Sequence, residues 1–286
     1  MKLKNNSVTP AIKCVLETLY IKYNHRSLIK PDPLQFIYNY SRPDDMEIAG
    51  LLSAVLAYGR VEQIQKSSKK LLSLMGESPY KFILDFNKTH RSKLQGFKHR
   101  FTTGNDIADL LTLLKIILLE HGSIENFFLL DYSKSDRNII PALTNFCDSL
   151  LNIYAHQYKK EAPKGLKYLL VSPLNGSACK RLNLFLRWMV RKDDVDTGLW
   201  KSIDMAKLIV PIDVHMGRLC RILGFHNNKT ISLQTAINIT EKFSEIEPSD
   251  PVKYDFALSR IGIVENCNGK PGPSCNFCHL QQFCIQ

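Results

Sequence analysis

Apolar side chains recur every three to four positions along most of the chain, which is the spacing of one helical face. The segment Pro10 to Asn24 shows this spacing clearly, with Ile12, Val15 and Leu19 on one face. The same spacing predicts further helices over residues 46–58, 61–75, 105–120, 138–158, 178–191, 214–223, 233–243 and 251–265. No stretch alternates cleanly between apolar and polar positions, and the short segment 167–171 is ambiguous. The pattern therefore predicts an all-α fold.

The length of 286 residues is enough for one large domain or for two modest lobes. The longest apolar run, 110–119, is too short to cross a bilayer and is interrupted by Lys115. The N-terminus lacks the apolar stretch of a signal peptide. We therefore expect a cytoplasmic protein with no membrane partner. Its eight cysteines would then be reduced, which indicates metal binding or buried thiols instead of disulfides.

The chain is basic, with a formal net charge of +11 at pH 7. A surplus of this size favours a polyanionic partner, either nucleic acid or an anionic membrane, although a basic proteome would also produce it. Only Glu161 opposes a dense run of cations: Lys159, Lys160, Lys164, Lys167, Lys180, Arg181, Arg187, Arg191 and Lys192. The run is either a solvated helical face or a phosphate-binding surface. We favour the phosphate-binding surface because the charges are clustered.

Four cysteines lie close together near the C-terminus: Cys267, Cys275, Cys278 and Cys284. Their spacing is C-x7-C-x2-C-x5-C, and the first gap is rich in glycine and proline, which lets the loop curl. Four thiolates suit either a [4Fe–4S] cluster or a tetrahedral zinc ion. Zinc sites usually contain two Cys-x2-Cys pairs, and only one is present here. The spacing therefore favours a [4Fe–4S] cluster.

The sequence around these cysteines resembles a known family. The segments 256–267 and 274–284 are similar to the C-terminus of endonuclease III and the adenine glycosylases, which belong to the helix-hairpin-helix (HhH-GPD) DNA glycosylase superfamily. The first gap between cysteines has seven residues here and six in that family. The resemblance implies a structural cluster whose loop presents a basic residue to the DNA backbone, and Lys270 is the candidate. The overall layout is also similar to a family of uncharacterised bacterial proteins.

The segment Val210 to Arg218 resembles the Val-Asp-Thr-His-x-x-Arg stretch of the superfamily, which carries an essential aspartate. From the residues alone, Asp213 precedes an apolar helix and is most simply a structural N-cap. The resemblance implies a second role. A carboxylate kept ionised by the helix dipole would stabilise a sugar that is becoming an oxocarbenium ion.

The segment Gly176-Ser-Ala-Cys-Lys180-Arg181 resembles the end of the superfamily's hairpin, Gly-x-Gly-x-Lys. The resemblance implies that Lys180 is the amine that attacks the deoxyribose C1′, with Gly176 and Arg181 at the DNA. Arg181 would help to lower the pKa of the amine. The second hairpin glycine is replaced by Ala178. The longer gap between Lys180 and Asp213 is similar to that of the archaeal 8-oxoguanine glycosylases, which hints at an oxidised purine.

The segment Leu52 to Val61 resembles the helix and turn that open the helical barrel of the superfamily. Tyr58 and Arg60 would fill the space that a flipped base leaves in the duplex. The alternative is an ordinary joint between two helices.

Together these features predict a two-lobed HhH-GPD-like fold. Residues 44–204 would form a helical barrel that includes a degenerate hairpin at 173–181. Residues 205–286 would form the cluster lobe with its loop at 267–284, and residues 1–43 would pack on that lobe. We expect a monomeric glycosylase, with AP-lyase activity, that removes a damaged base from double-stranded DNA. The alternatives are a non-catalytic iron–sulfur DNA-binding protein, and a redox-sensing or RNA-directed one.

Overall fold

The computed structural model describes residues 8–264, 267 and 272–284, and these residues are mostly helical. The expectation of an all-α protein is confirmed. The longer helices fall where the apolar spacing predicted them, most closely at α3. Their bounds are α1 Val8–Tyr23, α2 Pro43–Val55, α3 Val61–Met75, α6 Gly104–His121, α8 Ile140–Tyr158, α10 Lys180–Val190, α11 Val214–Ile222, α12 Leu233–Ile246 and α13 Asp255–Val264.

Several short elements escaped the sequence pattern because each is too short to show a helical period. They are α4 Pro79–Leu84, α5 Lys88–Lys93, α7 Ile124–Leu129, α9 Lys164–Leu169 and a small antiparallel hairpin, β1 Lys98–His99 with β2 Thr102–Thr103. The ambiguous segment 167–171 covers the end of α9 and the two residues that follow it. Side chains of Ser78, Asn87 and Ser123 accept hydrogen bonds from backbone N–H groups at the starts of α4, α5 and α7. These N-caps were the available sequence signal.

Short 3₁₀ helices complete the chain at Arg26–Leu28, Pro33–Asn39, Pro173–Asn175, Met205–Lys207, Pro273–Phe277 and Gln281–Phe283. No helix in the described ranges is both long and apolar enough to pass through a bilayer.

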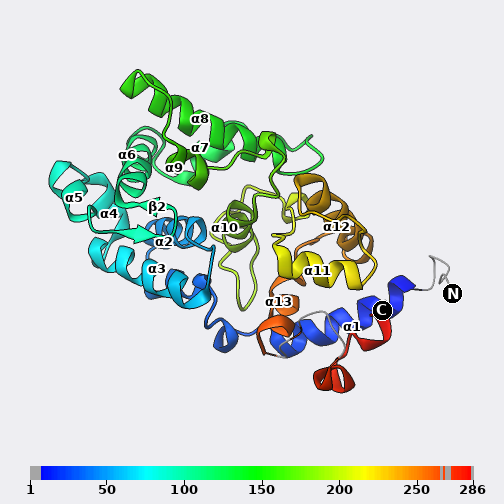
Figure 1. The fold of residues 1–286 in the computed structure, drawn as a ribbon. Helices are drawn as coiled ribbons and strands as arrows, with labels where there is room; N and C mark the ends of the chain where they lie inside the picture. The colour runs from blue at the N-terminus through cyan, green and yellow to red at the C-terminus, as the bar shows by residue number, and fades with distance from the viewer. Residues whose placement is uncertain (1–7, 265–266, 268–271, 285–286) are drawn as a thin grey trace.

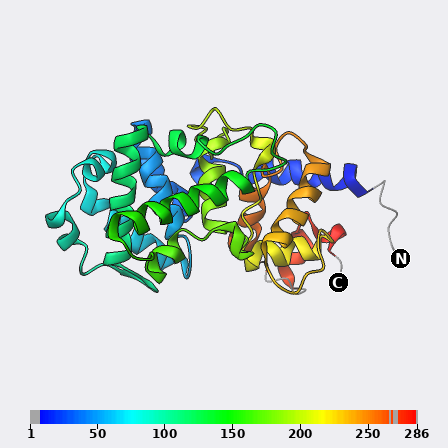
Figure 2. The same ribbon diagram turned by 90° about the horizontal axis from the view of Figure 1, so that it is seen from above.

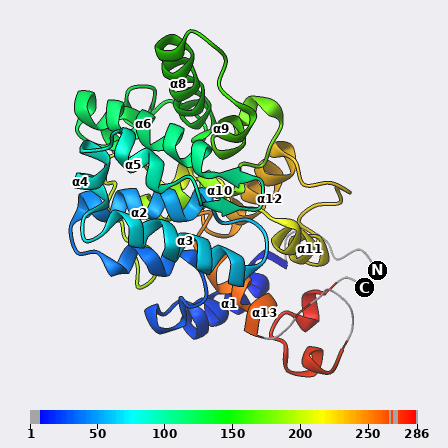
Figure 3. The same ribbon diagram turned by 60° about the vertical axis from the view of Figure 1, so that its left-hand side comes forward.

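Helix α10 lies in the middle of the molecule, between two groups of helices (Figures 1, 2 and 3). Helices α2 to α9 gather on one side, whereas α11, α12, α13 and α1 gather on the other. Residues Leu182 to Val190 of α10 are all buried, and the helix packs against α2. The N-terminal part of the chain contributes to both groups. Helix α1 packs against α12 and α13, but the 3₁₀ helix Pro33–Asn39 packs against α2 and α3.

A buried network of charges joins the end of α10 to distant parts of the chain. The Arg191 guanidinium contacts three carboxylates, at 2.7 Å from Asp250, 2.5 Å from Asp193 and 2.8 Å from Asp196. Arg187 contacts Asp196 as well, at 3.3 Å. Both arginines are almost fully buried. The interpretation of the basic run as a phosphate-binding surface is therefore wrong for Arg187 and Arg191, whose charges are neutralised inside the protein.

Candidate active site

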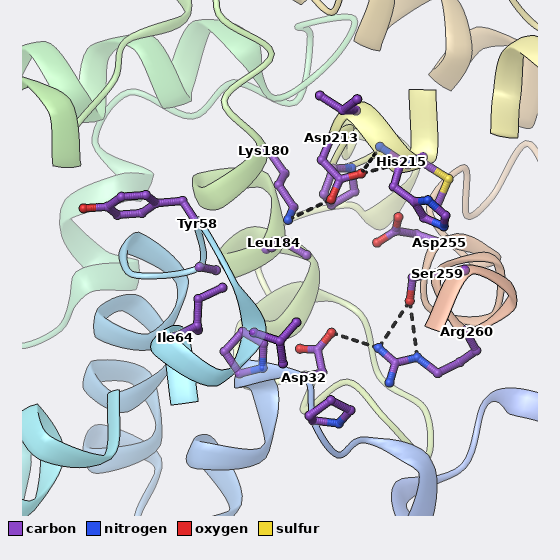
Figure 4. A pocket seen from close by; sticks show the side chains of 18 of the residues that line it. Asp32, Tyr58, Ile64, Lys180, Leu184, Asp213, His215, Asp255, Ser259 and Arg260 are labelled. Atoms are coloured by element: carbon purple, nitrogen blue, oxygen red, sulfur yellow. Dashed lines mark hydrogen bonds and ion pairs between the residues drawn. The ribbon is translucent and has the colours of Figure 1, made fainter. Parts of the chain in front are cut away.

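A pocket of about 560 Å³ opens where α10, α11 and α13 meet the turn between α2 and α3 (Figure 4). Its wall includes both residues that the sequence singled out for catalysis, Lys180 and Asp213. Apolar side chains of Ile64 and Leu184 form part of the lining. The pocket therefore combines apolar walls with many charged side chains of both signs.

Asp213 is the N-cap of α11, as the sequence predicted. Its Oδ1 accepts hydrogen bonds from the backbone N–H groups of His215 at 2.9 Å and Met216 at 2.8 Å. Burial raises the pKa of this carboxyl, but Lys180 and the Met216 N–H oppose burial and the net pKa is lower than the ordinary value. Asp213 is therefore a carboxylate at neutral pH, fixed in direction by the helix that it caps.

Lys180 is the first residue of α10, and its side chain points toward Asp213 (Figure 4). The Lys180 Nζ lies 3.1 Å from Asp213 Oδ2, so one carboxylate oxygen caps α11 while the other holds the amine. Both side chains remain partly accessible, at 32% for Lys180 and 41% for Asp213. The fold therefore brings the two residues together at the pocket wall, where a ligand can reach both.

The turn before Lys180 differs in detail from a glycine hairpin. Gly176 is exposed and has a left-handed backbone with φ 72°, and its carbonyl accepts the Leu233 N–H at 2.8 Å. The second left-handed residue is Cys179, with φ 46°, and not Ala178 at the position of the second hairpin glycine. The turn nevertheless joins two helices, because α9 precedes it and α10 follows it.

Arg181 contacts the protein itself. Its guanidinium donates hydrogen bonds to the carbonyl oxygens of Val55, at 2.8 Å, and of Tyr168. It also lies over the rings of Tyr58 and Tyr168, at 5.1 Å and 4.5 Å from their centroids. Arg181 thus braces the end of α2 against α9, and these contacts leave it little freedom to bind a phosphate.

Tyr58 and Arg60 flank the turn at Gly59, which has a positive φ of 94°. Tyr58 lines the pocket, but its hydroxyl donates to the carbonyl of His99 at 2.8 Å and hydrogen-bonds Thr102 Oγ1 at 2.7 Å. Arg60 is exposed at the start of α3. The role of these two residues in filling a gap in DNA stays a prediction.

The four C-terminal cysteines are all reduced and partly buried. Burial raises the pKa of the Cys284 thiol, and the other three thiols raise it further, so the four groups interact. The Gly272 N–H donates to Cys275 Sγ at 3.4 Å, as amides do around iron–sulfur clusters. Within residues 8–264, 267 and 272–284, however, no three His, Cys, Asp or Glu side chains stand close enough to share a metal ion. The predicted phosphate contact, Lys270, lies outside the described residues.

Among the polar residues of the pocket that the sequence did not single out are Asp32, Asp255 and Arg260. Asp32 and Arg260 form an ion pair at 3.3 Å and lie across the pocket from Lys180 and Asp213 (Figure 4). Burial raises the pKa of Asp255 to about 6, against the opposing effect of Arg187. No local pattern marks these residues, because each reaches the pocket only through packing between distant segments, the 3₁₀ helix Pro33–Asn39 against α2 and α3, and α13 against α1 and α11.

No curated protein and no solved structure matches the chain. A family model described as "Protein of unknown function (DUF2400)" matches residues 32–264, which include the pocket residues Lys180 and Asp213. The match covers well over half of the chain, and the chain therefore belongs to the DUF2400 family.

Proposed function

We propose that the protein is a DNA glycosylase with AP-lyase activity that removes a damaged base from duplex DNA. One observation carries the proposal: a lysine amine stands 3.1 Å from a helix-capping carboxylate at the wall of an accessible pocket. A nucleophile held beside a fixed negative charge is what displacement at a sugar carbon requires.

The proposed reaction uses both side chains of this pair. As the glycosidic bond breaks, the base leaves with the bonding electrons and takes up the proton that Lys180 Nζ gives up, and the free amine attacks C1′. Asp213 stabilises the positive charge that develops on the sugar as the bond lengthens. The C1′–O4′ bond then breaks, O4′ takes up a second proton from Nζ, and a protonated imine joins Lys180 to the opened sugar. Asp213 accepts the C2′ proton, which the imine has made acidic, and the electrons of that C–H bond expel the 3′ phosphate and cut the strand.

The surroundings of the pair support a nucleotide substrate. An enzyme that acts on a base must take it out of the stack into a pocket, and a pocket of about 560 Å³ is large enough for one nucleotide. Helix α9, the turn at Gly176 and α10 form a helix–turn–helix whose last element begins with Lys180. Exposed cations on α9 and before it, such as Lys160 and Lys164, remain available for phosphates.

The four cysteines would hold a [4Fe–4S] cluster that shapes the C-terminal loop, in keeping with their all-thiol donor set and the amide directed at Cys275. We expect the purified protein to be brown and to contain iron and acid-labile sulfide in equal amounts. Replacement of Cys278 by serine should lower both together, whereas replacement of the distant Cys14 should lower neither. Colourless protein that contains zinc would contradict the cluster and support a zinc loop.

A non-catalytic DNA-binding protein is the second candidate. The observation in its favour is the turn before α10, where Ala178 replaces the second hairpin glycine and Cys179 takes the left-handed conformation. A turn altered in this way could still bind a backbone after the chemistry was lost. Such a protein would bind duplexes with and without lesions equally and would release no base.

The test is a panel of duplexes that each carry one lesion: 8-oxoguanine, thymine glycol, uracil or an abasic site. Release of free base and covalent trapping by borohydride are measured on the same reactions. We expect one lesion class to give both signals. Base release without trapping would contradict the lysine mechanism and leave a monofunctional glycosylase that uses Asp213. Neither signal with any lesion would contradict the enzyme and favour the binding protein.

A further inference from the structure

The β1–β2 hairpin is anchored firmly beside the pocket. His99 is fully buried, and its ring hydrogen-bonds Ser67 Oγ at 2.9 Å and the Tyr58 carbonyl at 3.1 Å. In return, the Tyr58 hydroxyl bonds to the backbone carbonyl of His99 and to the side chain of Thr102, one on each strand. The two strands are therefore clamped by a residue that also lines the pocket.

The apex of the hairpin rests on the turn at Gly59. Arg100 adopts a left-handed backbone with φ 52°, which a non-glycine residue takes up only when its surroundings hold it there. Its side chain covers Gly59 so closely that a Cβ on this glycine would lie 2.7 Å from Arg100 Cδ. Because Gly59 lines the pocket, the apex is fixed at the pocket rim.

The aromatic residue at this apex is left in solvent. Phe101 is 68% exposed, although His99 and Thr102, which the clamp holds, are fully buried. Its ring meets Tyr168 only edge-on, with centroids 6.1 Å apart, and the Arg100 guanidinium lies 5.2 Å from it. Single exposed apolar side chains are ordinary on protein surfaces. Phe101 differs because its ring is aromatic and is held at the apex of a hairpin that is fixed beside the pocket.

We propose that Phe101 inserts between stacked bases of duplex DNA, next to the nucleotide that enters the pocket. The proposal rests on the proposed function, since it assigns the same DNA substrate to this surface. The hairpin also carries two exposed cations, Arg100 next to the ring and Lys98 on β1, which could contact phosphates of the same duplex. Apolar wedges of this kind unstack bases and kink the duplex. The rigid clamp below the ring would resist the force that the separated bases exert on it.

Tyr58 was expected to fill the space that a flipped base leaves in the duplex, and the insertion of Phe101 takes over part of that role. The Tyr58 hydroxyl is held by two partners inside the protein, so its ring cannot leave for the duplex without releasing the hairpin. Tyr58 acts instead as a positioning residue that holds Phe101 at the rim. Arg60, exposed at the start of α3, keeps its place as a candidate for direct contact with DNA.

The test uses a duplex with a tetrahydrofuran abasic-site analogue beside 2-aminopurine, whose fluorescence rises when it unstacks. This duplex cannot be cleaved by a lyase, so the readout does not depend on catalysis. We expect wild-type protein to raise the fluorescence. Phe101→Ala should lose most of the rise and bind about tenfold more weakly, because stacking on each base contributes substantially to affinity. Phe101→Trp should keep the rise, and so should Leu119→Ala, which truncates an equally exposed residue on α6.

An unchanged rise with Phe101→Ala would overturn the insertion, as would the absence of any rise with the wild type. These results are separate from the glycosylase assay. A rise that depends on Phe101, without release of any base from the lesion panel, would support insertion and contradict the proposed enzyme. Base release, together with a fluorescence rise that is the same with and without the Phe101 ring, would support the enzyme and contradict the insertion.

Discussion

Replacing Lys180 by glutamine is expected to abolish borohydride trapping and to lower strand cleavage by at least about 100-fold. An amide cannot form an imine with the opened sugar, so the covalent route closes while the pocket keeps its shape. The measurement is trapping and single-turnover cleavage on the lesion that the wild type prefers. The matched control is Lys242→Gln, which makes the same change at an exposed lysine of α12 that pairs with Glu245 at 2.6 Å.

Two further variants separate the charge of the pair from its chemistry. Lys180→Arg keeps a cation opposite Asp213 but cannot form an imine, so it should behave like Lys180→Gln in trapping. Asp213→Asn keeps a side chain that caps α11 well. It should therefore leave the melting temperature nearly unchanged while base release falls by about 10²- to 10³-fold, the usual cost of losing one preorganised electrostatic partner. Full activity in Asp213→Asn would show that Asp213 serves only as the N-cap of α11 and has no part in catalysis.

Replacing Arg191 by methionine is expected to destabilise the fold by about 3–5 kcal/mol. Arg191 contacts three carboxylates, and Asp196 among them is completely buried. Burial raises the pKa of Asp196, and the two arginines beside it counter that effect by favouring its charged form. Without Arg191, Asp196 keeps its contact with Arg187, whereas Asp193 and Asp250 lose this guanidinium. The measurement is denaturant unfolding followed by circular dichroism.

The adjacent residue supplies the control. Lys192 is exposed, so Lys192→Met removes the same charge but should change the free energy of unfolding by less than about 0.5 kcal/mol. Adding Asp196→Asn to Arg191→Met removes one of the carboxylates that has lost a partner. The double variant should therefore lose less unfolding free energy than the two single variants lose when their losses are added. Equal, small effects at Arg191 and Lys192 would show that the network contributes little to stability.

The buried charge network of Arg187 and Arg191 also helps to position the pocket residues. Helix α10 carries Lys180 at its start and Arg187 near its end, and Arg187 binds Asp255, which lines the same pocket. Any change that frees the end of α10 should therefore alter the position of Lys180 relative to Asp213. The cations that hold this helix lie in the part of the chain that looked, from the sequence, like a surface for phosphates.

Local regularities were readable from the chain alone. The apolar period placed α3 at Val61 to Met75, and the cap signal placed Asp213 at the start of α11. Both depend on neighbours within a few residues, where the helical period and hydrogen bonding to the backbone are decided. The close spacing of the four cysteines, and the resemblance to a glycosylase family, came from the same local information.

Tertiary structure decided everything that depends on residues distant in the chain. Whether an arginine is a surface charge or a buried one cannot be read from its neighbours, because the partners of Arg191 include Asp250 as well as Asp193. Likewise, the pocket needs α10, α11 and α13 to meet, and only their packing sets Lys180 against Asp213 and leaves Phe101 at the rim. The sequence by itself determined the longer helices and nominated the reactive residues. The packed core determined which of them face one another, because burial and ion pairing act between segments that the local pattern treats as independent.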